Sequence, residues 1–547
     1  MGTRGEVMLG HDVVARAFVD QGVDTVFGVL GDGNLFIAET MMRVHGVRFV
    51  AATHEANAVM MAEGWAKASG RLGVATVTHG PGLTNTITAL VEGVKNRTPM
   101  LLLVADTPTE DRHHLQNLPQ RAVVDSTGAG FQQVLSPATI TVDVAEAVRR
   151  AWAERRPIVL NVPLDFEWVE LDYVAAPVVR VTPTRVAPDP VALDVALGVA
   201  ATAARPVVLA GRGAVGAQAE LVALAERLGA PVATTHAATN LFRDDPWNLG
   251  IHGTLTTPVA AEALATADCL VCFGAALNFY TTAQGTMTAG KRIVQVDLDP
   301  ERIGATLAVD AGVVGDAAEV ATAMVGLLDA AGHQPSAFRS AELADRLAAW
   351  DPAAAFVDRS TDVAVDPRTL MLRLEDLLPE DRTVVVDAGR FMLHVLGMEV
   401  RDPSSMITTH AFGSIGLGTS AAIGVAVARP DRPTVLCVGD GGLMMGGVAE
   451  LHTAVAEGLD LITVLHNDSS YGAEHVQLWR KNMAADASMH EWPDLAAVAE
   501  AMGFEVVRVR CLADLDLAAK AVATRVPGRP VFIEASLDAL MVSEING

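Results

Sequence analysis

The chain has 547 residues, of which half are apolar and 19% are charged, with a formal net charge of −25. This length predicts about two to four domains, because single hydrophobic cores rarely grow beyond ~250–300 residues. The negative charge excludes a nucleic-acid-binding protein, and the absence of any uninterrupted apolar run of about 18 residues excludes a membrane span. Four cysteines and an N-terminus without a signal-peptide core favour a cytoplasmic protein.

Residues 1–175 show short apolar runs that alternate with longer amphipathic runs. The short runs predict strands and the longer runs predict helices. This alternation is typical of a parallel sheet with helices on both faces, so we expect a doubly wound α/β domain. The strands are expected at residues 25–28, 73–78, 100–105 and 158–162, and the helices at 8–21, 56–69 and 85–96.

A second α/β domain is expected over residues 190–335, after a proline-rich linker at 176–190. It carries Gly-x-Gly-x-x-Gly at residues 211–216, at a predicted strand–helix junction. The following strand lacks the acidic residue that would hold a ribose, so a nicotinamide site is not expected. Cys269 and Cys272 lie in an apolar run and predict a buried pair on a strand rather than a redox or zinc site.

A third α/β domain is expected over residues 360–547, after an alanine-rich link at 332–355. The predicted fold class is therefore α/β, with three doubly wound parallel-sheet domains. The strands of the third domain are expected at residues 383–387, 434–438, 461–466 and 531–534.

The third domain contains Gly-Asp-Gly-Gly at residues 439–442, where one predicted strand ends, and Asn467 where the next one ends. Carboxylate and amide oxygens suit Mg²⁺, which keeps coordination positions for water and phosphate oxygens. The glycines allow main-chain N–H groups at a helix N-terminus to approach a diphosphate. The sequence therefore predicts a magnesium–diphosphate site that uses Asp440 and Asn467. A tight strand–helix turn without a ligand is the alternative.

Four further motifs accompany this one in the sequence. They are Phe-Gly-Val-Leu-Gly-Asp-Gly-Asn at 27–34, Thr-His-Glu-Ala-Asn-Ala at 53–58, Thr-His-Gly-Pro-Gly-Leu-Thr-Asn at 78–85 and Ala-Phe-Gly-Ser-Ile-Gly at 411–416. Together the motifs resemble the thiamine diphosphate (ThDP) enzymes of the acetolactate synthase, pyruvate decarboxylase and benzoylformate decarboxylase type. The resemblance implies a pyrimidine-binding, a central and a diphosphate-binding domain, in that order.

The resemblance also implies roles for individual residues. Glu55 would activate the cofactor through a hydrogen bond to its pyrimidine ring, Ile415 would hold the cofactor in its bent form, and the Gly413 carbonyl would accept from its amino group. A helix N-terminal glutamate and an ordinary core isoleucine are the alternatives. The implied metal ligands are Asp440, Asn467 and the main-chain carbonyl of Ser469. The further implied cofactor contacts are Gly389, Gly439, Gly441, Gly442, Tyr471 and Gly472.

Four polar residues resemble the acid–base set with which pyruvate decarboxylases protonate their substrate. They are Asp32, His113, His114 and Glu474, the last of which fits only with a one-residue insertion in the preceding segment. Asp32 as a plain turn residue and the two histidines as a solvated loop are the alternatives. The resemblance therefore makes these residues candidates for moving protons on the substrate side.

The segments at 78–85 and 104–108 are instead closer to acetolactate synthases. We therefore expect ThDP- and Mg²⁺-dependent decarboxylation of a 2-oxo acid, with carboligation of the acyl anion to a carbonyl acceptor. The alternatives are a simple decarboxylase that releases an aldehyde, a non-catalytic ThDP-binding homologue and a nicotinamide dehydrogenase. The family's cofactor bridges two subunits, so the resemblance implies a homodimer or homotetramer with active sites at the interface.

The sequence leaves FAD binding in the central domain open. The segment at 294–300 resembles the adenosine-side strand of flavin-containing relatives, whereas the segment at 274–279 does not match their flavin contacts.

Overall fold

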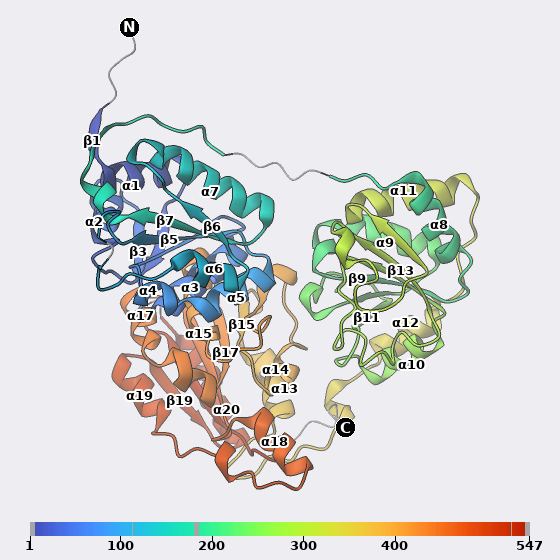
Figure 1. Cartoon of the computed structure of the whole chain (residues 1–547). Coiled ribbons are helices and arrows are strands. Elements are labelled where there is room, and N and C mark those ends of the chain that lie inside the picture. The colour runs from blue at the N-terminus through green and yellow to red at the C-terminus, as the bar shows by residue number, and fades with distance from the viewer. Residues whose placement is uncertain (1–5, 112, 180–184, 527, 542–547) are drawn as a thin grey trace. The chain divides into compact units, whose positions relative to one another are not determined.

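The structure is a computed structural model that describes residues 6–111, 113–179, 185–526 and 528–541. Within these residues the chain divides into two compact units. The first unit runs to residue 182 and resumes over 358–395 and from 404 onward, and the second takes residues 183–357 and 396–403. The first unit holds two six-stranded sheets and a two-stranded one, and the second unit holds one six-stranded sheet (Figure 1).

The N-terminal sheet of the first unit has six parallel strands, four of which form at the short apolar runs that were predicted as strands. In sheet order the strands are β3 (Arg48–Ala51), β2 (Thr25–Gly28), β4 (Gly73–Val77), β5 (Met100–Asp106), β7 (Pro157–Pro163) and β6 (Gly130–Gln133). The helices are α1 (Gly10–Asp20), α2 (Leu35–Arg43), α3 (Glu55–Ser69), α4 (Pro81–Thr84), α5 (Ile87–Asn96), α6 (Gln120–Thr127) and α7 (Ile140–Glu154). A small antiparallel pair, β1 (Val7–Leu9) with β8 (Glu170–Asp172), lies beside them.

The C-terminal sheet of the same unit also has six parallel strands. In sheet order they are β16 (Met406–Thr408), β15 (Thr383–Val386), β17 (Thr434–Gly439), β18 (Leu461–Asn467), β20 (Val531–Ser536) and β19 (Glu505–Val509). The helices are α13 (Pro367–Leu377), α14 (Met392–Val395), α15 (Gly418–Ala428), α16 (Asp440–Gly442), α17 (Glu450–Ala456), α18 (Gly472–Arg480), α19 (Leu495–Met502) and α20 (Leu515–Thr524). Counted along the chain, both sheets of this unit have the strand order 2-1-3-4-6-5.

The second unit holds a six-stranded parallel sheet whose order, counted along the chain, is 3-2-1-4-5-6. This is the order of dinucleotide-binding doubly wound sheets. The strands are β11 (Asn248–Ile251), β10 (Val232–Thr234), β9 (Pro206–Ala210), β12 (Cys269–Phe273), β13 (Arg292–Asp297) and β14 (Ala311–Val314). The helices are α8 (Pro190–Ala201), α9 (Gln218–Leu228), α10 (Pro258–Thr266), α11 (Ala317–Ala330) and α12 (Ala341–Ala348), the last within the segment predicted as a link.

Two helices join the sheets of the first unit through one continuous core. Figure 1 shows α3 and α15 between the N-terminal and C-terminal sheets. Their backbones touch, because a Cβ at Gly424 would overlap the Met61 carbonyl and one at Gly64 would overlap the Ala421 carbonyl. Apolar residues of both helices share one buried cluster. The predicted fold class, three parallel α/β sheets, is confirmed.

Candidate active site

The Gly-Asp-Gly-Gly motif lies at the carboxyl edge of the C-terminal sheet, where open α/β sheets place their ligands. Gly439 ends β17 opposite His466 of the neighbouring strand β18, so Asp440 and Asn467 follow at the same edge. Asp440 begins α16 and is only 2% exposed. Directly after it the helix widens into a π-helical turn over Leu443–Gly447, a form common at functional sites.

Gly441 and Gly442 of the motif lie where an added side chain would collide with a neighbouring side chain. A Cβ on Gly441 would lie 2.7 Å from the ring of Tyr471 and 3.9 Å from the side chain of Ile415. A Cβ on Gly442 would overlap the carboxylate of Asp387. The structure therefore brings Gly441, Gly442, Ile415 and Tyr471, all implied by the resemblance, together at one place, and adds Asp387, which sequence reasoning missed.

The side chain of Asp440 is suited to a cation. Its Oδ2 accepts from the main-chain N–H of Ser470 at 3.1 Å and from the indole Nε1–H of Trp492 at 2.9 Å. Burial, together with the nearby charge of Asp468, raises the pKa of Asp440 to about 7. A buried carboxylate needs compensation by a positive charge or by donors, so a divalent cation here would stabilise its ionised form.

The other two implied ligands lie on the adjoining turn. Asn467 donates from Nδ2 to Glu534 at 2.8 Å, and its Oδ1 accepts from the main-chain N–H of Ser469 at 3.1 Å. Ser469 has φ +55°, a left-handed conformation that a non-glycine residue rarely adopts and that often marks functional turns. No group of at least three His, Cys, Asp or Glu side chains among the described residues could hold a metal. A cation in this part of the chain would therefore depend on the mixed set of Asp440, Asn467 and the Ser469 carbonyl.

The segment that carries Ile415 is held from both sides. Gly413, two residues before Ile415, and Gly416, directly after it, both have φ +86°. Asp387, at the end of β15, accepts from the N–H groups of Gly416, Leu417 and Gly418 at 2.9–3.3 Å. Burial raises the pKa of Asp387 to about 6, although these donors favour its ionised form. The loop is therefore fixed to the edge of the sheet that carries Asp440.

A second buried carboxylate holds the start of the same segment. Glu92 of α5 accepts from the N–H groups of Ala411 at 2.9 Å and Phe412 at 2.7 Å. Its side chain is fully buried. Gly389, which has φ +154°, and Gly472, at the start of α18, complete the predicted cofactor contacts at this edge.

Glu55 is the first residue of α3, directly after the turn that follows β3. Its Oε2 accepts from Asn85 Nδ2 at 2.9 Å, and the residue is partly exposed. Residues on either side of Glu55 are held by Glu450 of α17, whose Oε1 accepts from the N–H of Thr53 at 2.7 Å and from Asn57 Nδ2 at 2.9 Å. The two domains of the first unit therefore position the glutamate together.

The predicted substrate-side residues fall into two groups. Asp32 and His114 belong to one cluster, because Asp32 accepts from Thr78 Oγ1 at 2.9 Å and the rings of His79 and His114 lie 5.3 Å apart. His79 is fully buried, and this burial lowers its pKa. By contrast, His113 is exposed. Glu474 is exposed in the first turn of α18, on the other domain.

Glu167 is a residue near this cluster that sequence reasoning missed. It is 1% exposed, and neither carboxyl oxygen has a hydrogen-bond partner among the described residues. Burial, together with the nearby charge of Asp32, raises the pKa of Glu167 to about 8. It therefore holds its proton at neutral pH. The signal in the sequence is an acidic residue between Phe166 and Trp168, just after a buried strand.

The glycine motif of the second unit has a packing role. Gly211 and Gly213 lie so close to Gly274 that a Cβ on either would overlap its backbone. Cys269 and Cys272 are fully buried thiols on β12, as predicted, and burial raises the pKa of Cys269 to about 12.

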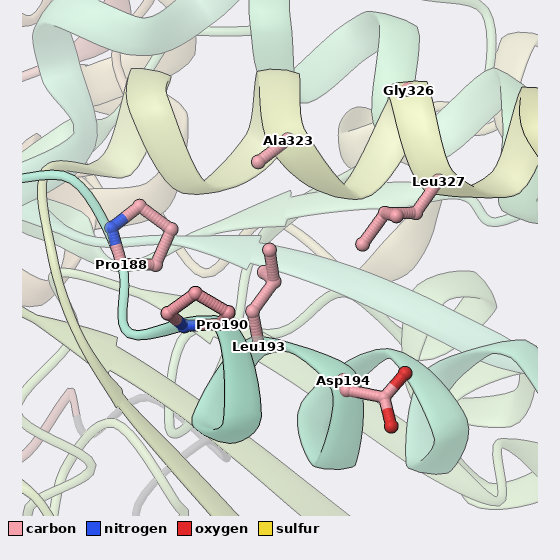
Figure 2. A pocket seen from close by; sticks show the side chains of 7 residues that line it. All are labelled: Pro188, Pro190, Leu193, Asp194, Ala323, Gly326 and Leu327. Atoms are coloured by element: carbon pink, nitrogen blue, oxygen red, sulfur yellow. The ribbon is translucent and has the colours of Figure 1, made fainter.

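The same unit carries an open apolar depression between α8 and α11 (Figure 2). Asp194 is the one charged side chain at its rim. The depression is lined by Pro188, Pro190, Leu193, Asp194, Ala323, Gly326 and Leu327. None of these is among the residues predicted to bind the cofactor.

Three features of the structure define a ThDP-dependent enzyme. They are the two related parallel sheets, the Gly-Asp-Gly-Gly turn beside Asn467, and the glutamate at the N-terminus of α3. Family models agree: the N-terminal thiamine pyrophosphate-binding domain matches residues 8–129, the central domain 193–324 and the C-terminal thiamine pyrophosphate-binding domain 387–535. The chain belongs to the thiamine pyrophosphate-dependent enzyme family and is of its acetolactate synthase-like type.

Relatives of several activities align over almost the whole chain. The sulfoacetaldehyde acetyltransferase of Rhodobacter capsulatus is 29% identical, over 97% of this chain and 94% of its own. The acetolactate synthase large subunit of Parasynechococcus marenigrum is 28% identical, over 94% and 86%. A probable 2-ketoarginine decarboxylase of Pseudomonas aeruginosa is 29% identical, over 93% and 91%. These names are consistent with a ThDP-dependent lyase or transferase. Among the described residues no helix is long and apolar enough to cross a membrane.

Proposed function

We propose that the protein decarboxylates a 2-oxo acid with ThDP and Mg²⁺ and transfers the acyl anion to a carbonyl acceptor. The observation that carries this proposal is the separation of the pyruvate decarboxylase-like acid–base set. Within one domain only Asp32 and His114 of this set share a cluster, because His113 is exposed and Glu474 lies on the domain of the proposed metal ligands. The site therefore has one proton donor fewer at the substrate, His113, which favours attack on a second carbonyl over protonation.

The residues present fit both groups of the proposed cofactor. Asp440, Asn467 and the Ser469 carbonyl would hold Mg²⁺, and the N–H groups that follow Gly439 would meet the diphosphate. When bound, ThDP supplies the nucleophilic carbon and the electron sink for cleavage of the bond between a carbonyl and its carboxylate. Ile415 would support the shape of the cofactor, and Glu55 would hold a proton at its pyrimidine ring.

We further propose that the enzyme is a homodimer or homotetramer with its active sites at the subunit interface. Glu55 and the turn that carries Asp440 lie on different domains, which suits a cofactor that bridges two chains. Analytical ultracentrifugation of the ThDP- and Mg²⁺-loaded protein tests this. A monomer with full activity would refute it.

A simple 2-oxo acid decarboxylase is the second candidate. The cluster of Asp32, Thr78, His79 and His114 favours it, because these side chains could protonate the product carbon and release an aldehyde.

Product analysis separates the two functions. The protein is incubated with pyruvate, ThDP and Mg²⁺, with bulkier 2-oxo acids in parallel reactions and Glu55→Gln as the inactive control. Acetolactate or acetoin is the expected result. Free acetaldehyde alone would establish the decarboxylase and make His114 a candidate proton donor. The absence of any product from all 2-oxo acids would refute both functions.

A further inference from the structure

A short segment after α18 lies against the turn that carries the proposed metal ligands. This strap, residues 488–492, runs antiparallel to that turn through the pair Ser470 and Met489. The Ser488 carbonyl accepts from the N–H of Tyr471 at 2.9 Å, and the N–H of His490 donates to the Ser469 carbonyl at 2.8 Å. The strap is therefore held by its main chain to residues 469–471.

The strap ends in a tryptophan that reaches the metal carboxylate. The Nε1–H of Trp492 donates to Asp440 Oδ2 at 2.9 Å, the same oxygen that accepts from the N–H of Ser470 at 3.1 Å. An indole N–H can only donate, so it orients a carboxylate without acting as a metal ligand itself. Two donors on one oxygen fix the rotation of the Asp440 side chain.

Aromatic packing fixes the direction of this indole. The ring of His490 stacks on Trp492, with centroids 4.5 Å apart and planes 24° apart. Tyr471 meets His490 edge-on at 4.4 Å, and its own ring packs over Gly441 of the motif. Trp492 also packs against the core cluster of the first unit. The indole cannot turn away from Asp440 without breaking the stack.

We propose that Trp492 is a positioning residue of the metal site, which holds Oδ2 of Asp440 and turns its other oxygen towards the cation. The inference rests on the proposed binding of ThDP and Mg²⁺ at this turn. A residue that orients a metal ligand in this way changes metal affinity about 10- to 100-fold when it is removed.

The test compares two tryptophan variants with the wild-type holoenzyme. Trp492→Phe keeps an aromatic ring for the stack and removes the N–H, while Trp479→Phe changes a side chain that is 52% exposed on α18. Each protein is stripped of cofactor and titrated with Mg²⁺ at a fixed ThDP concentration. The ThDP retained after desalting is measured together with tryptophan fluorescence.

We expect Trp492→Phe to raise the half-saturating Mg²⁺ concentration about 10- to 100-fold, and Trp479→Phe to change it less than about twofold. The wild type and Trp479→Phe should show a fluorescence change that follows the titration, and Trp492→Phe should lose it. The fluorescence of the wild type keeps the proposal testable even if Trp492→Phe fails to fold. Wild-type half-saturation in a folded Trp492→Phe, or no fluorescence response in the wild type, would overturn the proposal.

Asp440→Ala separates this inference from the proposed function. If Asp440→Ala loses ThDP retention while Trp492→Phe behaves as the wild type, the role of Trp492 alone is refuted. If the wild type and Asp440→Ala retain ThDP equally at every Mg²⁺ concentration, the proposed metal site itself is refuted.

Discussion

Replacement of Glu450 tests whether the C-terminal domain holds the segment that carries Glu55. The Glu450 side chain is fully buried and accepts hydrogen bonds from both sides of the domain junction. Its Oε1 accepts hydrogen bonds from the N–H and Oγ1–H of Thr53, both at 2.7 Å, and from Asn57 Nδ2 at 2.9 Å. Its Oε2 takes the hydroxyl of Thr453 at 2.8 Å.

The expected loss follows from these four bonds. Glu450→Ala removes all of the acceptors, but Thr53 is exposed and can turn to water. Asn57 and Thr453 are buried, and each lost bond from a buried donor to a charged acceptor costs about 1.5–3 kcal/mol. Both keep a weaker second acceptor, at the Gly446 and Ala51 carbonyls, so we expect a net loss of about 3 kcal/mol. Glu450→Gln keeps Oε1 with its three donors and should cost about 1 kcal/mol or less.

Thermal unfolding of the purified variants measures these differences, and about 3 kcal/mol corresponds to a fall in Tm of roughly 5 °C. The matched control is Glu457→Ala, which removes an ion pair with Arg48 that also joins the two domains but has side chains 23% and 43% exposed. Exposed pairs contribute about 0–1 kcal/mol, so the control should unfold within about 2 °C of the wild type. Equal shifts for Glu450→Ala and Glu457→Ala would refute the reasoning.

Two other variants test chemistry and electrostatics. We expect Glu55→Gln to lower turnover more than 100-fold while ThDP is retained, because the amide cannot hold the proton. This loss corresponds to a rise of about 2.7 kcal/mol or more in the activation barrier. Turnover near that of the wild type would refute the role of Glu55. Glu167 has a folded pKa near 8, above its unfolded value of 4.5, so the fold binds a proton that the unfolded chain releases, and stability falls as pH rises between these values. The stability of Glu167→Gln relative to the wild type should therefore increase with rising pH, by about 4 kcal/mol between acidic pH and pH 8. Parallel Tm profiles of the two proteins between pH 5 and pH 8 would contradict this.

The sequence predicted the sheets well where strands are buried on both faces. Residues 434–438 and 461–466 are mostly apolar runs, and β17 and β18 extend each by only one residue. The position of Asp440 and Asn467 at one edge of the sheet could be predicted because their places at the ends of these runs follow from chain order alone. The edge strand β6 (Gly130–Gln133) was missed because half of its four residues are glutamines, which lack the β-branched signal.

The residues that hold the site could not be predicted in the same way. Glu92 and Glu450 have the pattern of solvated helix residues, since Glu92 lies within a helical run and Glu450 begins one. Their burial is a result of tertiary contacts, because Glu92 meets Ala411 across 319 positions of the chain and Glu450 meets Thr53 across 397. Trp492 likewise reaches Asp440 across 52 positions. Local periodicity carries no information about partners this distant.

Glu92 and Glu450 show how the two domains of the first unit depend on each other. Each is a fully buried carboxylate that accepts main-chain N–H groups from the other domain. Glu450 holds the turn before Glu55, and Glu92 holds the loop before Ile415. An unpaired buried carboxylate is costly, so each side chain stabilises the fold only while the opposite segment stays in place. The geometry of both cofactor segments is therefore a property of the packed pair of domains, joined through α3 and α15, and neither sheet alone could maintain it.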